Sequence, residues 1–153
     1  MKRHQSFVSL SREHHDGLLL ATRLQQGNTA LLRLWSHELR WQAEYVVKFF
    51  DDLLATHFEE EEEIVFPYAK EYLGEHKRLI DRLIAEHQEM RKMIDVLRYP
   101  QERNLEHTLK RFGTLLEQHI RSEERTLFPL CEEKLPPELL SEIGKKLQQP
   151  TDG

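Results

Sequence analysis

The sequence predicts an all-α protein that folds as an up-down-up-down antiparallel four-helix bundle with a short C-terminal helix. In four long segments, apolar residues recur three and four positions apart, as on helices that bury one face. No segment alternates between polar and apolar residues over the length of a strand. The connections between the segments are short, which favours antiparallel packing of helices that follow each other in the chain.

The first helix is expected to begin at a serine that caps its amino end, either Ser9 or Ser11. It should stop near Gly27-Asn28, because glycine and asparagine are frequent where helices end. Residues 25–41 lead into a second helix that is much longer than the first. We therefore expect a bend, a separate helical turn or an overhang in this stretch.

The second helical pattern builds up after Thr29 and carries a strong apolar stripe from Ala43 to His57. It continues to about Phe66, where Pro67 predicts a kink or an end because proline lacks a backbone N–H. Three further helices are expected, over residues 75–97, 102–128 and 136–146.

Length and composition indicate one domain over residues 1–153, with a bundle core at about 8–130 and an extension over 131–153. The net charge of −5 and the lack of a basic block argue against a nucleic-acid partner. No apolar run has the length of a membrane helix or a signal peptide. The lone Cys131 excludes an internal disulfide and a two-cysteine zinc site. We expect a cytoplasmic protein without a membrane partner, and the sequence indicates no particular protein partner.

An eleven-residue motif occurs twice, 62 residues apart. Both copies read H-x-x-x-E-E-x-x-x-F-P, as HFEEEEEIVFP from His57 to Pro67 and HIRSEERTLFP from His119 to Pro129. A shorter Glu-His pair also occurs twice, at Glu13-His14 and Glu86-His87. The two patterns alternate along the chain, which predicts two helical hairpins of similar design.

Helical phase places part of each motif on an inward face. Residues four apart lie one above the other, so Glu61 lies one turn beyond His57 and Glu123 one turn beyond His119. His87 falls on the apolar stripe of its own helix. The next inward residues are expected to be Ile64, Val65 and Tyr68 after the first glutamate, and Leu127 and Leu130 after the second.

Six ionisable groups are therefore expected inside the bundle, and they are costly to bury without partners. Metal ions remove that cost, and inward glutamates and histidines are how helical bundles build dinuclear carboxylate sites. Imidazole and carboxylate ligands suit iron, with zinc and manganese as alternatives. The sequence predicts two metal ions, with Glu61 and Glu123 as candidate bridges. The six candidate ligands are His14, His57, Glu61, His87, His119 and Glu123.

The neighbours of these residues allow other interpretations. A single inward histidine is most often an ordinary core residue, and His15 competes with His14 as the first ligand. We choose His14 because it aligns with His87 in the repeated pair and shares a face with neighbouring leucines. Glu62 and Glu124 lie 100° from the inward glutamates and are candidates to support the ligands. The other three glutamates of the 59–63 run and four other histidines are expected at the surface: Glu59, Glu60, Glu63, His4, His37, His76 and His107.

With these motifs over residues 8 to 130, the sequence resembles the hemerythrin/HHE cation-binding family. The resemblance implies a four-helix bundle that holds a non-haem di-iron centre bridged by two carboxylates, with the six residues above as ligands. It also implies oxygen, nitric oxide, iron or redox chemistry. Oxygen-carrying hemerythrins have a fifth histidine four residues from another on the third helix. Here the positions four before and four after His87 are Leu83 and Arg91.

The missing histidine leaves more positions on the metal open to water or a small molecule. It therefore argues against reversible oxygen carriage. We expect a metal-binding protein rather than an enzyme. It should bind or respond to oxygen, nitric oxide or peroxide in sensing, storage, redox or iron handling. Two alternatives stay open: a di-iron oxidase or peroxidase, and a zinc- or manganese-bound structural or interaction module.

Overall fold

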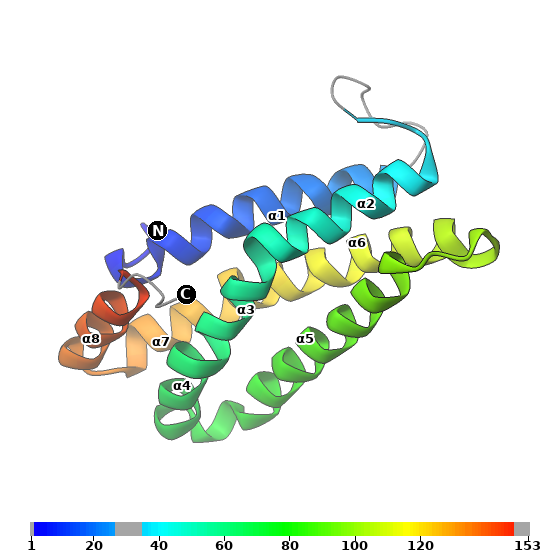
Figure 1. Ribbon diagram of the computed structural model, residues 1–153. Helices are drawn as coiled ribbons and strands as arrows, with labels where there is room; N and C mark the ends of the chain where they lie inside the picture. Colours follow the sequence, from blue (N-terminus) through cyan, green and yellow to red (C-terminus); the bar gives the residue numbers. More distant parts are fainter. Residues whose placement is uncertain (1, 27–34, 149–153) are drawn as a thin grey trace.

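The computed structural model describes residues 2–26 and 35–148, and these residues form helices and turns without a β-strand (Figure 1). The all-α prediction is confirmed, with four long helical segments and a short C-terminal helix. The α-helices are α1 (Val8–Gln26), α2 (Leu39–Phe49), α3 (Ala55–Glu60), α4 (Phe66–Tyr72), α5 (Lys77–Arg98), α6 (Leu105–Ser122), α7 (Phe128–Lys134) and α8 (Pro137–Gln148).

Turns of π-helix join some of these elements into longer helices. η3 (Phe50–Leu54) and η4 (Glu61–Val65) connect α2, α3 and α4 without a break. η7 (Glu123–Leu127) connects α6 to α7 in the same way. Three short 3₁₀ turns complete the description, η1 (Gln5–Phe7), η5 (Gly74–His76) and η6 (Glu102–Asn104).

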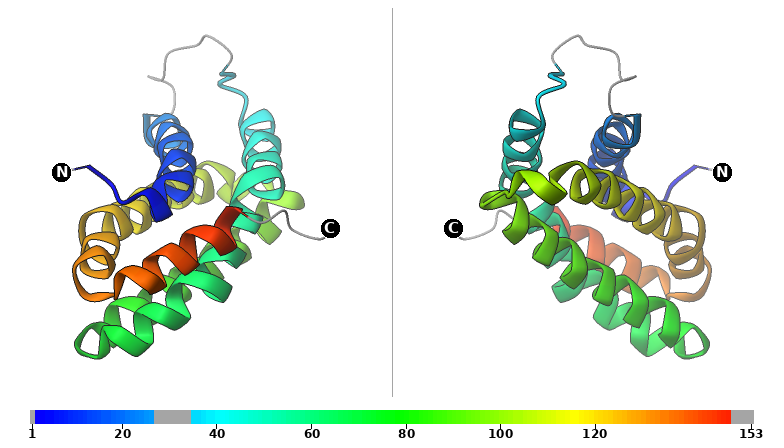
Figure 2. Two further views of the ribbon diagram at one scale, coloured as in Figure 1. Left: turned by 90° about the vertical axis from the view of Figure 1, so that its left-hand side faces the viewer. Right: turned by 90° about the vertical axis from the view of Figure 1, so that its right-hand side faces the viewer.

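The helices pack side by side around a common interior. α1 lies along α6, and α5 packs against both α6 and α2 (Figure 1). α8 packs against η1 and η4 at one end of the bundle, as the end-on views of Figure 2 also show. This arrangement is compatible with the predicted up-down-up-down order.

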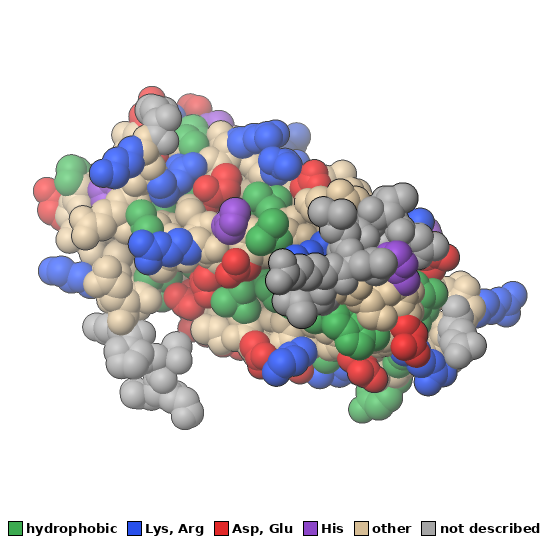
Figure 3. Space-filling model, turned by 90° about the horizontal axis from the view of Figure 1, so that it is seen from above, with side chains coloured by type: hydrophobic (Ala, Val, Ile, Leu, Met, Phe, Trp, Pro, Cys, Tyr) green, Lys and Arg blue, Asp and Glu red, His purple; other side chains and the backbone are tan. Residues whose placement is uncertain are grey.

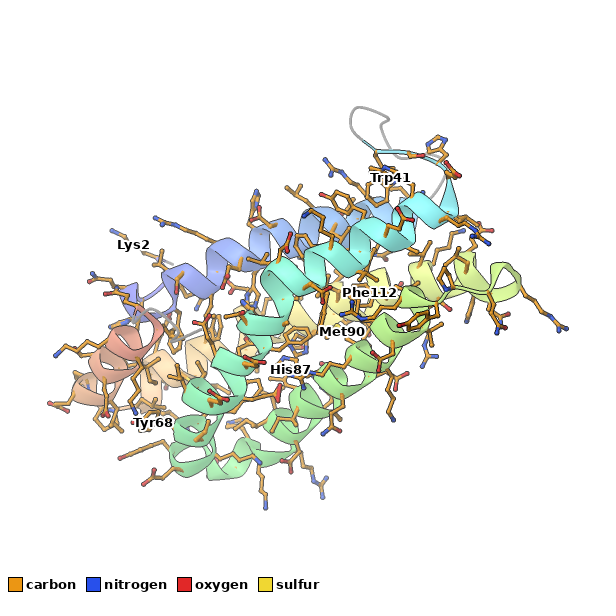
Figure 4. The ribbon with its side chains drawn as sticks, viewed as in Figure 1. Lys2, Trp41, Tyr68, His87, Met90 and Phe112 are labelled. Atoms are coloured by element: carbon orange, nitrogen blue, oxygen red, sulfur yellow. The ribbon has the colours of Figure 1, made fainter. Side chains whose placement is uncertain are left out.

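The apolar core consists of two clusters, one toward each end of the bundle. One contains Leu20, Val46, Met90 and Phe112, and the other contains Phe7, Leu10, Phe66, Leu83 and Ile143. Each long helical segment has a buried histidine near the boundary between its residues of the two clusters. Figure 4 labels one of them, His87, which lies inside the bundle near Met90 and Phe112. The charged candidate ligands therefore form a polar layer between two apolar halves.

The second helix begins later than the sequence pattern predicted. α2 starts at Leu39 rather than soon after Thr29, because Glu38 at its amino end has an extended backbone with φ −74° and ψ 122°. Residues 35–38 are not helical, and Trp35 is buried against Trp41 and Tyr45 at ring separations of 5.4 Å. The predictions made for residues 27–34 lie outside the described residues.

The predicted serine caps were wrong, and of the two outcomes predicted at Pro67, a kink or an end, the end was wrong. α1 follows directly from η1, which His4 caps by accepting a hydrogen bond from the backbone N–H of Ser6. Ser9 and Ser11 both lie inside α1. The helix continues past Pro67 to Tyr72, because the proline occupies the first turn of α4, where no backbone N–H is required. Pro129 occupies the same place in α7.

The π turns change which residues face inward after each motif. A π turn holds one more residue than an α turn, so every later side chain is rotated around the helix axis. Val65 and Leu127 are buried as predicted, but Ile64, Tyr68 and Leu130 are only half-buried. Ala69 and Cys131, one position after Tyr68 and Leu130, are buried instead, and Phe66 and Phe128 are buried beside Val65 and Leu127.

Among the described residues, no helix combines the length and the apolar character needed to cross a membrane. On the face shown in Figure 3, acidic and basic side chains are interspersed with apolar ones.

Candidate metal centre

Four long helical segments each contribute one buried histidine to the polar layer, and two of them also contribute a glutamate. His14 comes from α1, His57 from α3, His87 from α5 and His119 from α6, and each is at most 2% exposed. Glu61 and Glu123 are the first residues of the π turns η4 and η7, and both are fully buried. The structure thus brings all six sequence-predicted residues together.

The six side chains form two sets of four that share both glutamates. We call His14 and His57, with the two glutamates, the first position, and His87 and His119, with the same glutamates, the second position. Within each set the potential ligand atoms lie within 4.8 Å of one another. Each set offers two nitrogen and two oxygen donors, which suits a divalent transition metal.

Distances between the atoms show that the glutamates span the two positions. Oε1 of Glu61 is 3.1 Å from Nε2 of His87, whereas its Oε2 is 3.5 Å from Nε2 of His57. Oε1 of Glu123 is 3.0 Å from Nε2 of His14 and 3.4 Å from Nε2 of His119. A carboxylate placed between two positions in this way can bridge two ions.

At each position, the Nε2 atoms of the two histidines point toward each other. Nε2 of His14 and Nε2 of His57 are 3.0 Å apart, and the Nε2 atoms of His87 and His119 are 2.9 Å apart. Two imidazole nitrogens that bind one ion at right angles, each about 2.1 Å from it, stand roughly 3 Å apart. The paired nitrogens therefore fit a shared cation.

Among the residues that the structure describes, three buried carboxylate oxygens make no well-aligned hydrogen bond, although Oε1 of Glu123 lies 3.0 Å from Nε2 of His14: Oε2 of Glu61 and both oxygens of Glu123. Leaving a buried charged acceptor unsatisfied is costly, and such atoms need a cation or a donor. Together with the converging nitrogens, these oxygens fit a metal ion better than an ordinary polar core.

Each histidine is held from behind by a carboxylate on another helical segment. Through its Nδ1 atom, His14 contacts Glu124 at 2.7 Å, and His87 contacts Glu62 at 2.8 Å. The other two contacts join His57 to Glu13 at 3.0 Å and His119 to Glu86 at 2.9 Å. An Nδ1–H that donates to a carboxylate leaves Nε2 free to bind a metal and raises its basicity.

These four contacts form a closed ring around the bundle. The carboxylate of each long helical segment holds the histidine of the next segment along the chain, and the last one, Glu124, returns to the first segment at His14. The supporting places predicted for Glu62 and Glu124 agree with this ring. Sequence reasoning missed the matching role of Glu13 and Glu86, although both belong to the repeated Glu-His pair.

Burial and charge have opposite effects on the pKa values of these groups. Burial lowers the pKa of His57, but the charge of Glu61 and the hydrogen bond to Glu13 outweigh it and raise the pKa to about 9. Burial likewise lowers the pKa values of His14 and His119, yet contacts with Glu123 raise both well above the ordinary value. Without a cation, the centre therefore holds protons, which a metal ion would displace.

The carboxylates respond in the opposite sense. Burial raises the pKa of Glu61, but the charge of His57 and contacts with the other buried groups hold it well below its usual range. The pKa of Glu124 is raised by partial burial and lowered more strongly by its hydrogen bonds to His14 and Ser11. Both side chains are thus anions at neutral pH, as metal ligands and their supports need to be.

Aromatic rings close the centre on several sides. Phe58 stacks on His87 with ring centroids 3.9 Å apart, and Phe66 lies 5.6 Å from the same histidine. Phe128 stacks on His14 at 5.6 Å. This apolar shell keeps water away from the ligands and strengthens electrostatic interactions inside it.

The neighbouring histidine His15 is exposed, whereas His14 points into the centre. Among the other histidines, His4 and His107 are exposed as predicted, but His37 and His76 are half-buried. Glu59 and Glu63 are exposed, while Glu60 is half-buried beside the centre. The helical phase therefore separated most of the inward residues from their outward neighbours.

A comparison with protein families adds an independent finding. The model of the hemerythrin HHE cation binding domain matches residues 6–131, which is most of the chain. The chain belongs to this family. No curated protein and no solved structure gives a significant match. The family's description indicates cation binding, and each of the two His/Glu clusters in this chain could hold a metal ion.

Proposed function

We propose that this HHE-domain protein holds two iron ions, one at each position, bridged by Glu61 and Glu123. The observation that carries the proposal is that both positions share two fully buried glutamates, three of whose four side-chain oxygens make no well-aligned hydrogen bond to any described residue. The proposed ligands are His14, His57, Glu61, His87, His119 and Glu123. We also infer that the four long helical segments follow one another in up-down-up-down order as a single domain.

Bound iron would supply redox chemistry and a place for a small ligand such as oxygen, nitric oxide or peroxide. The protein's own residues bind and orient: the ring of four carboxylates fixes the histidine tautomers, and Phe58, Phe66 and Phe128 exclude water. With six protein ligands for two ions, coordination is incomplete, so a small molecule can approach. We therefore propose a role in sensing, storage, redox response or iron handling.

The third helix supports this choice over reversible oxygen carriage. Leu83 and Arg91, one turn on either side of His87, are not ligands: Leu83 is part of the apolar core, and Arg91 pairs with Glu62 at 2.7 Å. No further histidine is available at these places. A cytoplasmic location and the absence of a nucleic-acid partner stay predictions.

Metal analysis of the protein loaded anaerobically with ferrous iron tests the proposal. We expect about two irons per chain and, after oxidation, a magnetically coupled pair in the Mössbauer spectrum. A single uncoupled iron, or nearly full occupancy by zinc in protein isolated from its native host, would contradict it. Steady turnover of peroxide above the rate of free iron would instead favour an enzyme.

A further inference from the structure

The two positions of the proposed centre have the same donors but different charges behind them. At the second position, both supporting carboxylates face an arginine. Glu62 makes a bidentate contact with Arg91, with distances of 3.2 and 2.7 Å, and Glu86 lies 3.9 Å from Arg82. The charge of Glu62 is therefore balanced by a close ion pair, whereas Glu86 has a longer contact with the exposed Arg82, which also donates to Ser122 at 2.9 Å.

The first position lacks this balance. Glu13, which holds one of its histidines, pairs with no lysine or arginine in residues 2–26 and 35–148. Glu124, which holds the other, is 3.5 Å from Arg3, but Arg3 also contacts Glu132 at 3.1 Å. One arginine thus serves two carboxylates here, and Glu13 has none.

A second acidic side chain, Glu60, lies on the same side of the centre as Glu13. Glu60 is the last residue of α3, is half-buried and directly precedes the buried Glu61. The side chain of Glu13 is 26% exposed, yet its carboxylate contacts the fully enclosed His57. Glu13 therefore connects the solvent to the buried centre.

Further inside, the first position also contains a carboxylate oxygen that makes no hydrogen bond to a described residue. Oε2 of Glu61 makes no hydrogen bond within residues 2–26 and 35–148 and faces the first position, 3.5 Å from His57 and 3.8 Å from His14. The other oxygen of Glu61 faces the second position, where it contacts His87 at 3.1 Å. A path of negative charge thus runs inward from Glu13 and Glu60 to this oxygen.

We propose that a divalent cation enters the centre at Glu13 and Glu60, and that the first position fills before the second. This inference rests on the proposed dinuclear site. Unbalanced carboxylates raise the local concentration of cations and speed their association.

Nuclear magnetic resonance of the imidazole nitrogens tests the order of filling in the unmodified protein. The metal-free chain is titrated with Zn²⁺, which is diamagnetic and accepts the same donors. At one equivalent, the Nε2 signals of His14 and His57 are expected to change, and those of His87 and His119 only as the second equivalent is added. Initial change at His87 and His119, or equal change at all four, would overturn the proposal.

Matched variants test the path. Glu13→Gln is expected to weaken the first binding step roughly tenfold, as measured by competition with a chromophoric chelator. The equivalent change in the other hairpin, Glu86→Gln, should weaken the second step instead. If both variants weaken the same step equally, the difference between the positions is refuted.

Glu60→Gln is expected to slow zinc uptake at low salt, with a difference that shrinks as ionic strength rises. The exposed Glu59→Gln is the control and should leave the rate unchanged. Equal rates for the two variants would remove Glu60 from the path. The proposed function fails by a different result, since a chain that binds fewer than two ions at saturation has no dinuclear centre, whatever its uptake rate.

Discussion

The two copies of the H-x-x-x-E-E-x-x-x-F-P motif, residues 57–67 and 119–129, fold alike but pack differently. In both copies, a π turn starts at the buried glutamate. It leads into a helix whose first turn holds the proline. The residue after the histidine differs. Phe58 stacks on His87, with Arg91 5.8 Å from its ring, whereas Ile120 packs against Gly17.

This difference separates what the proposed centre requires from what can vary around it. The shared residues supply the donor atoms and their supports: one histidine, one buried glutamate and one outer glutamate in each copy. The residues that differ supply the packing and the balancing charges. Two similar half-sites can therefore present the same ligands to metals in unequal surroundings.

The largest expected effect follows from removing a shared glutamate. Glu61→Ala should lose both metal ions, because this side chain faces both positions. Glu123→Ala should have the same effect if the two copies are equivalent. Metal content after loading and desalting measures the loss, and the exposed Glu63→Ala is the control. A similar loss in the Glu63 variant would contradict the assignment by helical phase.

Removal of a histidine should affect one position only. His14→Ala is expected to lower the metal content to about one ion per chain, because the second position keeps its own histidines. His15→Ala should retain both ions, since His15 is exposed. If metal content falls in the His15 variant and not in the His14 variant, the first ligand has been assigned wrongly.

The stability of the metal-free protein should depend on pH. The pKa of His57 is raised in the folded chain to about 9 from an ordinary value near 6.5, so its protonated form stabilises the fold. That stabilisation is complete below the ordinary pKa and is lost as pH rises through 9, by up to about 3 kcal/mol. Urea unfolding across this range measures the effect.

The metal-loaded protein is the control for this pH dependence. Its histidines carry the metal in place of the protons, so its stability should not fall over the same range. An equal decline with and without metal would show that the buried histidines are not the cause.

A smaller effect is expected where the two copies pack differently. Ile120→Phe, which gives the second copy the residue of the first, should destabilise the fold by about 1–3 kcal/mol through overpacking. The space is limited because even a Cβ added at Gly17 would lie 2.8 Å from Cδ1 of Ile120. Ile120→Leu, which conserves volume, is the control in urea unfolding. Equal stability of the two variants would mean that the surroundings adapt.

Much of the centre could be predicted because its ligands follow simple helical phase. His57 and Glu61 are one turn apart, and both are buried as that spacing requires. The support given by Glu13 and Glu86 could not be predicted in this way. Glu13 reaches His57, and Glu86 reaches His119, only because the two helices in each pair are rotated suitably about their axes. The sequence of a single helix does not specify that rotation.

The residues that face inward beyond the two buried glutamates could not be predicted from the sequence either. A π turn has no strong local sequence signal, and an ordinary α-helix would have placed Ile64 and Tyr68 inward instead of Phe66 and Ala69. Similarly, the sequence pattern did not show that α2 starts only at Leu39, after the extended Glu38.

Anomalous diffraction from crystals of the iron-loaded protein, collected at the iron absorption edge, tests the central claim most directly. The structure predicts two peaks per chain, one between His14 and His57 and one between His87 and His119, with Glu61 and Glu123 in contact with both. A single peak, or peaks outside this ring of histidines, would contradict a centre bridged by the two buried glutamates.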